Sequence, residues 1–411
     1  MLTRSAPRPR APHPSVFLLL NLPRGLTGGY ITVVLPFLVT NAGLPVLTAA
    51  SMVAVALSPK AWKIIWAPLA DVGLTLKKWY IIGACLAGGM LLLQSLLPVT
   101  QATVPLLTVG LFITECAANL LAAPLGALMA EATPDHLKGQ AAAWYQIGGK
   151  LATGVGGGVG LWLAVHTGSA AVSGAVLGLG CIGCILGLAL IDEPERRLAA
   201  SVFARLKATG LELWQMLKSR EGVLVAALAL SPIGISGVDD FWSAVAKEWG
   251  ASARTVVVVT GFASAAISCV GCLLAGWWAD RADRRAVYLT TGLFVAAAGM
   301  VLALTPHVPR MFVVGTLAQK FFIGMSDAAI YALFLRIIGR SAAATKFAVL
   351  AALSNVGELY MTITSGWIHD RWGATTMLLV ESLTALACIA AATWALRALQ
   401  RDRRTVAAYR A

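Results

Sequence analysis

Apolar segments of about 20 residues recur along the whole chain, separated by short stretches rich in Pro, Gly and polar residues. A helix of about 20 apolar residues crosses the roughly 30 Å hydrocarbon core of a bilayer, so each segment predicts one membrane-spanning helix. The pattern predicts twelve spans, at residues 15–41, 45–70, 79–98, 102–131, 139–165, 169–191, 222–247, 254–279, 286–305, 309–338, 344–369 and 374–397.

The composition agrees with a membrane protein. Of the 411 residues, 58% are hydrophobic and 12% are charged, and the mean hydropathy is +0.77. A soluble domain would carry roughly 25% charged residues. The loops between spans are also too short to hold a soluble domain. We therefore expect an all-α integral membrane protein with twelve transmembrane helices.

One longer polar segment divides these spans into two groups of six. We expect a disordered cytoplasmic N-terminus (1–14), an N-terminal six-helix bundle (15–191), a cytoplasmic central loop (192–221), a C-terminal six-helix bundle (222–397) and a basic cytoplasmic tail (398–411). Apolar positions from Val202 to Leu217 predict an amphipathic helix on the inner leaflet, acting as a connector or, alternatively, as a regulatory element. The first apolar segment is too long for a signal peptide and contains Arg24, so we interpret it as a retained span.

A similar pattern ends the second helix of each half. Asp71 closes an apolar segment and is followed by the basic pair at 77–78; about 209 residues later, Asp280 is followed by the basic pair at 284–285. The segments around Lys150 and Glu358 align at nearly the same offset, which gives equivalent positions opposite charges. Duplication on this scale predicts two parallel repeats that move against each other, an architecture typical of transporters.

The net charge of +13 follows this topology rather than a nucleic-acid interface. If the N-terminus is cytoplasmic, the outer segments carry only Lys247, Arg254, Arg310 and Arg371, and most other Lys and Arg residues lie in inner loops and the tail. This asymmetry obeys the positive-inside rule, so both termini are expected in the cytoplasm. We expect no nucleic-acid partner.

The loop after the span 254–279 contains most of the G-x-x-x-D-R-x-G-R-R signature of the major facilitator superfamily. The matching residues are Gly276, Asp280, Arg281, Arg284 and Arg285. Asp283 stands where that family usually has Gly, and the copy after Asp71 is degenerate. The chain resembles this superfamily along its whole length, which implies the major facilitator fold of two parallel six-helix repeats.

A shorter stretch indicates a branch of that family. The segment Lys63–Asp71 is similar to the K-x-x-W-A/S-P-L-x-D stretch of the muropeptide permease (AmpG-like) and acetyl-coenzyme A transporter branch. The Gly-rich span 139–165 lacks the Gly-Pro pair of the drug/proton antiporter signature, which argues against a drug exporter.

The acid and basic residues of the two loops predict a cytoplasmic gate. An Asp at a helix end pairs with Arg side chains or with the N-terminus of a neighbouring helix, and such pairing closes one side until it breaks. The alternative is that the basic residues only set the topology, although this leaves the acid at each helix end unexplained. The expected gate residues are Asp71, Lys77, Lys78, Asp280, Arg281, Arg284 and Arg285.

Ionisable residues inside spans are costly and mark a pathway, a proton site or an internal ion pair. The resemblance implies that the first, fourth, seventh and tenth spans line a central cavity. The candidate substrate-binding or coupling residues are Arg24, Glu115, Asn119, Asp239, Asp240, Lys320, Asp327, Lys150 and Glu358. Further ionisable residues in spans are Lys60, Lys63 and Glu381. Lys60 and Lys63 either assist this site or extend to the inner interface.

The candidates differ in chemistry. The guanidinium of Arg24 is suited to grip carboxylate or phosphate bidentately. Glu115 lies near mid-membrane with Asn119 one turn later and is the favoured coupling carboxylate. Adjacent Asp239 and Asp240 would not both ionise readily in a low dielectric. They are either a proton-coupling pair or a wetted pair at the outer mouth, and an internal ion pair is an equal alternative for Glu358.

Cysteine and histidine predict no metal or catalytic centre. The pairs Cys181-x-x-Cys184 and Cys269-x-x-Cys272 lie in apolar spans and are interpreted as packing residues. No Ser-His-Asp arrangement can be assembled at one depth, and Gly148-Gly149-Lys150 lacks the pattern of a phosphate-binding loop. We therefore expect no enzyme activity, no metal and no cofactor.

These features predict a secondary transporter of the bacterial cytoplasmic (inner) membrane. It would move a polar or anionic organic solute by alternating access, driven by protons, as a monomer. The alternatives are an exporter or uniporter of a small organic solute, or a non-transporting intramembrane enzyme or assembly factor on the same fold.

Overall fold

The computed structural model describes residues 12–193, 202–240, 242–339 and 341–410, without the side chains of 46, 61–62, 202–206, 240, 243–244, 253 and 398–410. Most of the predicted disordered N-terminus therefore lies outside the described residues. Within them, every regular element is a helix. The chain divides into two compact units: unit 1 is Met1–Leu213 with Ile338–Val349, and unit 2 is Trp214–Ile337 with Leu350–Ala411. The predicted domain boundaries at 191 and 222 stay a prediction.

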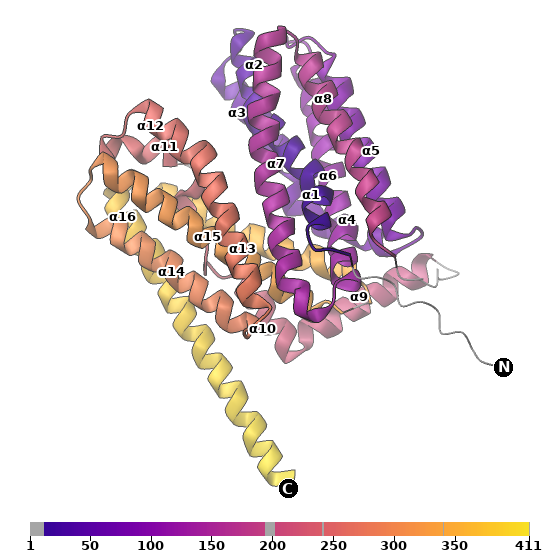
Figure 1. Ribbon diagram of the computed structural model, residues 1–411, viewed down its shortest axis with the longest axis vertical. Coiled ribbons are helices and arrows are strands. Elements are labelled where there is room, and N and C mark those ends of the chain that lie inside the picture. The colour runs from indigo at the N-terminus through magenta and orange to yellow at the C-terminus, as the bar shows by residue number, and fades with distance from the viewer. Residues whose placement is uncertain (1–11, 194–201, 241, 340, 411) are drawn as a thin grey trace, which may run out of the picture. The chain divides into compact units, whose positions relative to one another are not determined.

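Unit 1 contains the first group of helices (Figure 1). They are α1 (Val16–Gly29), η1 (Tyr30–Val34), α2 (Leu35–Asn41), α3 (Val46–Leu57), α4 (Pro59–Trp66), η2 (Ala67–Asp71), α5 (Leu76–Ser95), α6 (Val104–Ala132), η3 (Asp135–Leu137), α7 (Lys138–Thr167), α8 (Ala170–Gly183) and η4 (Cys184–Leu190). The predicted amphipathic segment is a helix, α9 (Val202–Lys218), which runs from unit 1 into unit 2. Its Leu211 and Trp214 are exposed, as a helix on a membrane surface requires.

Unit 2 contains the second group, which ends with two helices joined at a kink. Its elements are α10 (Arg220–Leu230), η5 (Gly237–Asp240), α11 (Trp242–Val245), η6 (Ala246–Trp249), α12 (Ala253–Val258), η7 (Val259–Ala263), α13 (Ser264–Ala279), α14 (Arg284–Leu304), α15 (Pro309–Ile337) and α16 (Ala343–Arg410). The first turns of α16 belong to unit 1. Polar caps begin several of these helices; Ser219, for example, accepts a hydrogen bond from the amide of Gly222 at 2.9 Å.

Seven helical segments within the described ranges are long and apolar enough to cross a membrane. They are Val16–Asn41, Leu76–Ser95, Val104–Ala132, Ala170–Leu190, Arg254–Ala279, Arg284–Leu304 and Ala343–Arg397. The last contains the final two predicted spans, which Gly373 separates with a φ of 77° and a ψ of 176°. The predicted spans 139–165 and 309–338 are the long helices α7 and α15. The many Gly residues of α7 lower its mean hydropathy, and the charged residues of α15 lower that of α15.

The two remaining predicted spans are interrupted. The span 45–70 is divided into α3, α4 and η2, with Pro59 starting α4. The span 222–247 is also interrupted: α10 ends at Leu230, and the chain is non-helical from Ser231 to Ser236. Pro232 lacks an amide donor, and Gly234 has a φ of 73°, so neither residue continues a helix here.

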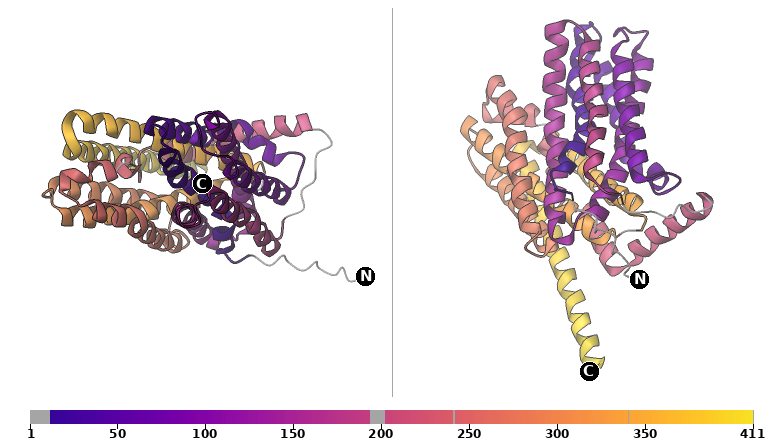
Figure 2. Two further views of the ribbon diagram at one scale, coloured as in Figure 1. Left: turned by 90° about the horizontal axis from the view of Figure 1, so that it is seen from above. Right: turned by 45° about the vertical axis from the view of Figure 1, so that its right-hand side comes forward.

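Glycine allows the helices of unit 1 to approach closely. Helix α1 packs along α7, and α5 contacts both α6 and α8 (Figure 1 and Figure 2). A Cβ atom on Gly25 would lie 2.4 Å from the carbonyl oxygen of Gly149, and one on Gly29 would lie 2.2 Å from that of Thr153. Small residues at such crossings are typical of helix packing in membranes. The Gly-rich sequence of α7 is therefore explained by its contact with α1.

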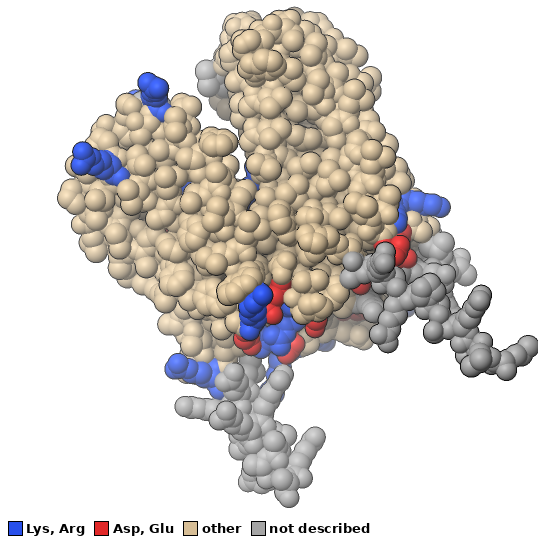
Figure 3. Space-filling model, in the orientation of Figure 1, with Lys and Arg blue, Asp and Glu red and all other residues tan. Residues whose placement is uncertain are grey.

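Unit 2 packs in a similar way. Helix α15 contacts both α13 and α14, and a Cβ atom on Gly271 would lie 2.1 Å from the carbonyl oxygen of Phe321. An aromatic cluster of Trp242, Trp249 and Phe312 fills the core beside η6. Both units present broad uncharged surfaces in Figure 3. Exposed apolar side chains such as Phe262 (84%) are expected where helices face lipid.

Candidate functional site

A buried carboxylate lies at the centre of the polar residues of unit 1. Glu115, on α6, is 1% exposed. Asn119 follows one turn later, and its Nδ2 donates to the Glu115 backbone carbonyl at 2.9 Å and to its Oε1 at 3.2 Å. The other carboxylate oxygen, Oε2, accepts no hydrogen bond from the described part of the chain. One face of this acid is thus fixed and the other is available.

Cations on two other helices act electrostatically on this carboxylate. The charges of Lys60, Arg24 and Lys63 all act on Glu115. The Arg24 guanidinium lies 5.6 Å from the centre of the Tyr145 ring, within the range of a cation–π contact. A Cβ atom on Gly149 would lie 3.1 Å from Nη2 of Arg24, so the small residue leaves space for the guanidinium. One acid and several cations therefore share a buried site on α1, α4 and α6.

The structure thus places Arg24, Glu115 and Asn119 together and adds Lys60 and Lys63 to them. The sequence signal for the two lysines is their position in an apolar span, five to eight residues before Pro68. Lys150 is half-buried on α7.

Two of the predicted site residues of unit 2 form an ion pair. Asp239 of η5 and Lys320 of α15 form an ion pair at 2.7 Å, with side chains 25% and 18% exposed. The side chain of Asp240 lies outside the described residues. Asp327 is half-buried on α15, and Glu358 is exposed on α16. The partial burial of Asp239 and Lys320 is consistent with a polar pathway in this unit.

A buried carboxylate in unit 2 is missing from the predicted site residues. Glu381, on α16, is 5% exposed. It accepts hydrogen bonds from the hydroxyls of Ser236 and Ser365 and from the amide of Val238. The resemblance does not place the last span at the cavity, so sequence reasoning leaves this acid out. Its signal was an isolated Glu in an apolar helix.

Asp71, the first predicted gate residue, caps the start of α16. Its carboxylate is buried at the end of η2 and accepts from the amides of Ala344 at 3.4 Å and Thr345 at 2.8 Å. The Thr345 hydroxyl donates to the same carboxylate at 2.7 Å. All these residues belong to unit 1. An anion at a helix N-terminus satisfies amides that lack partners within the helix and interacts favourably with its dipole.

The basic pair after Asp71 lies at the start of α5. Lys77 is half-buried and Lys78 is exposed. The amides of Leu76 and Lys77 donate to the Glu193 carboxylate, an N-terminal cap that the sequence did not predict because 116 residues separate Glu193 from Lys77.

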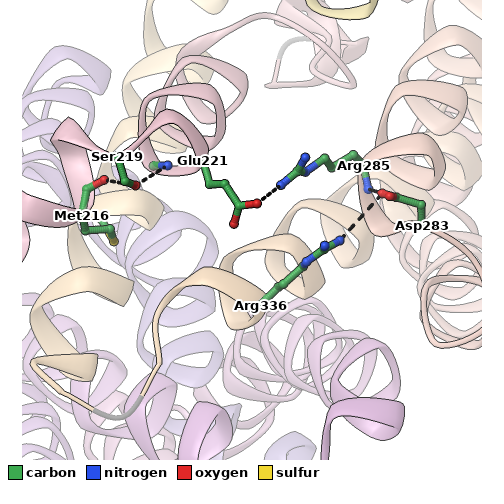
Figure 4. Close-up of polar contacts among 7 residues, drawn as sticks. Met216, Ser219, Glu221, Asp283, Arg285 and Arg336 are labelled. Carbon is green, nitrogen blue, oxygen red and sulfur yellow. Dashed lines mark hydrogen bonds and ion pairs between the residues drawn. The ribbon is translucent and has the colours of Figure 1, made fainter. Parts of the chain in front are cut away.

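The second loop forms ion pairs at its surface (Figure 4). Arg285 pairs with Glu221 at 3.1 Å. Asp283 accepts from the Arg285 amide at 2.8 Å, which caps α14, and lies 3.9 Å from Nη1 of Arg336. Cap formation explains why an Asp can stand where the signature has Gly.

Two further gate residues, Arg281 and Arg284, contact residues at the end of α13. Arg281 is exposed and lies 4.4 Å from the Trp277 ring. Arg284 is buried and its Nε donates to the Ala279 carbonyl at 3.4 Å. Asp280 is half-buried at the end of α13.

Two bundles of apolar helices with charged residues buried inside them define a multi-pass membrane protein. The sequence model of the Major Facilitator Superfamily matches residues 17–246 and 241–411. The chain therefore belongs to the major facilitator superfamily. This confirms the family and the all-helical two-repeat fold, and identifies the chain as a transporter.

Solved structures show the same fold. The human organic anion transporter MFSD10 (TETRAN) has 14% identity and a TM-score of 0.73, with 91% of this chain and 97% of that chain covered. The proton:xylose symporter XylE, bound to 6-bromo-6-deoxy-D-glucose, has 15% identity and a TM-score of 0.73, with 91% and 94% covered. The transporter FucP in its outward conformation has 16% identity and a TM-score of 0.70, with 93% and 98% covered. No curated protein sequence matches the chain.

Proposed function

We propose that this chain is a secondary active transporter that moves a polar or anionic organic solute by alternating access, coupled to protons. The observation that carries the proposal is the buried Glu115 with the charges of Arg24, Lys60 and Lys63 around it. Burying this many ionisable groups in a membrane bundle is costly, and such residues are retained where they bind a solute or carry a proton. The related folds of an organic anion transporter and a proton symporter support this choice.

The chemistry of the site suggests how the two ligands are linked. In the absence of solute, the carboxylate of Glu115 balances nearby cations. A proton on Glu115 removes that charge, which leaves Arg24 and the lysines to attract an anion. Solute and proton then favour each other's binding, as a symporter requires. Asn119 orients the carboxylate, and Asp239 with Lys320 extends the polar pathway in unit 2.

We further propose that Asp71 and its hydrogen bonds to the start of α16 form the gate, together with Lys77, Lys78, Asp280, Arg281, Arg284 and Arg285. Helix α16 begins in unit 1 and continues in unit 2, so the release of its first turn would change how the units move. In this proposal both termini are cytoplasmic, and the protein works as a monomer in a bacterial inner membrane.

A thermal-shift screen of the purified protein tests the solute site. The panel contains organic carboxylates and phosphates, small peptides, sugars and siderophores, at pH 5.5 and pH 7.5. A ligand that binds only the folded protein stabilises it by about 2.7 kcal/mol at 100 times its Kd, so binders raise the Tm. We expect an anionic solute to give a larger shift at pH 5.5.

Variants assign that shift to residues. Arg24→Ala should abolish it, and Glu115→Gln should keep it but remove its pH dependence. Lys207→Ala, which removes an exposed cation of the same unit, is the matched control and should behave as the wild type. A full shift in Arg24→Ala would contradict the site. A pH dependence that survives in Glu115→Gln would contradict proton coupling through Glu115.

A further inference from the structure

Glu381 is held by neutral donors on both of its carboxylate oxygens. Its Oε1 accepts from the Val238 amide at 3.1 Å and from the hydroxyl of Ser365. Its Oε2 accepts from the hydroxyl of Ser236 at 3.0 Å. These groups lie in η5 and its preceding loop, and in α16, all within unit 2. The donors therefore come from two separate stretches of chain, residues 236–238 and the part of α16 around Ser365.

No positive side chain in the described part of unit 2 pairs with this acid. Its carboxylate is buried and hydrogen-bonded, and no described charged residue acts on it electrostatically. Basic residues on the neighbouring helical segments have other partners: Lys320 pairs with Asp239 at 2.7 Å, and His369 pairs with Glu248 at 2.5 Å. A buried carboxylate without a counter-charge costs several kcal/mol, so this site favours the uptake of one positive charge.

Helix α15 contributes a further side chain to this cluster and carries two buried oxygen atoms without hydrogen-bond partners among the described residues. Gln319 is 2% exposed, and its Nε2 donates to Ser236 Oγ at 3.0 Å. The Oε1 atom on the same amide has no hydrogen-bond partner among the described residues, and neither does Thr316 Oγ1, one turn earlier on α15. Unsatisfied buried acceptors are unfavourable, whereas carboxylate, hydroxyl and carbonyl oxygens are suitable ligands for hard cations.

The local backbone agrees with an ion site. The chain is unwound from Ser231 to Ser236, between α10 and η5, and this stretch supplies one of the hydroxyls that contact Glu381. In membrane transporters, unwound backbone between two parts of a broken helix coordinates Na⁺ or H⁺.

We propose that Glu381, Ser236, Ser365 and Gln319 form a binding site for one monovalent cation, Na⁺ or a proton. Val238, which donates to Glu381, precedes Asp239, and Gln319 precedes its partner Lys320. Cation binding is thus linked through adjacent backbone to the ion pair assigned to the solute pathway. The role in coupling rests on the proposed transport function, whereas the binding of the ion itself does not.

Ion binding can be measured on the purified protein without any solute. The Tm is followed at pH 8 as NaCl replaces choline chloride at constant ionic strength. For a sodium site, we expect Na⁺ to raise the Tm in the wild type and to have no effect in Glu381→Gln. Ser365→Ala keeps the carboxylate and should weaken the apparent Na⁺ affinity about 10-fold. Asp370→Asn, which removes an exposed acid of α16 before the kink at Gly373, is the matched control and should titrate as the wild type.

Infrared spectroscopy distinguishes a bound proton from a bound Na⁺ at Glu381. If the cation is a proton, Na⁺ has no effect, and the Na⁺-free protein shows a protonated carboxylic acid band that Glu381→Gln removes and Asp370→Asn retains. The proposal is overturned if Na⁺ leaves the Tm unchanged and Glu381 contributes no such band. It is also overturned if Ser365→Ala, correctly folded, binds the ion as the wild type does. Neither failure would contradict the proposed solute site at Arg24 and Glu115, because these experiments contain no solute and do not test that site.

Discussion

The two copies of the loop pattern use their acids differently. In the first copy, Asp71 is buried and accepts three hydrogen bonds from the first turn of α16. In the second copy, Asp280 is half-buried, and residues near it form partly exposed ion pairs, such as Arg285 with Glu221, whose side chains are 18% and 45% exposed. The same arrangement of acid and basic residues thus gives a buried helix cap in one place and partly exposed ion pairs in the other.

This difference in burial and hydrogen bonding indicates which copy can hold a helix in place. A buried carboxylate that accepts several hydrogen bonds contributes more than a neutral hydrogen bond, because its removal leaves the amides unpaired. Exposed ion pairs contribute roughly 0–1 kcal/mol and weaken with salt. We therefore expect the first copy to carry most of the gating energy.

The largest effect is expected for Asp71→Ala. Loss of the cap should cost about 2 kcal/mol locally, which corresponds to roughly 30-fold faster hydrogen exchange at the amides of Ala344 and Thr345. Asp71→Asn, which keeps an acceptor, should give a smaller increase. Unchanged exchange at these two amides in Asp71→Ala would show that the cap does not hold α16.

A smaller effect is expected for Asp283→Ala. Its carboxylate caps α14, and loss of such a cap typically costs about 1 kcal/mol, so exchange at the Arg285 amide should rise about fivefold. Asp283→Asn should restore most of the protection, because Asn is also a good cap. If the Asn variant behaved like the Ala variant, the pairing with Arg336 rather than the cap would be responsible.

The smallest effect is expected for the partly exposed pair of Arg285 and Glu221. A double-mutant cycle with Arg285→Ala and Glu221→Ala should give a coupling energy of about 0.5 kcal/mol, and 1 M NaCl should reduce it further. Changes in Tm at low and high salt provide the measurement. A coupling energy larger than the cost of losing the Asp71 cap would contradict the expectation that the first copy carries most of the gating energy. A coupling energy that salt does not alter would contradict it as well.

Local and repeated features could be predicted from the sequence. The contact of Asn119 with Glu115 follows from their four-residue spacing on a helix, and the repeat identified Asp71 as a special acid. The partners of Asp71 could not be predicted, because Thr345 lies 274 residues away. In the same way, the contact between Ser236 and Glu381 could not be predicted, because 145 residues separate them in the sequence.

The broken helix after Leu230 shows a different limit. Hydrophobicity is continuous across this stretch, so a search for apolar segments predicts one span. Pro232 and Gly234 were the signals of a break, and both residues also occur inside membrane helices that stay continuous. Pro23 within α1 is an example in this chain.

Alternating access controlled by the Asp71 cap is the central claim, and a distance measurement tests it most directly. Spin labels at His136 of unit 1 and Ala282 of unit 2, both exposed, would report the separation of the two loops in a variant without native cysteines. We predict two distance populations in the wild type, and a shift of their ratio by roughly 30-fold toward the longer distance in Asp71→Ala. A single distance that Asp71→Ala leaves unchanged would contradict the account.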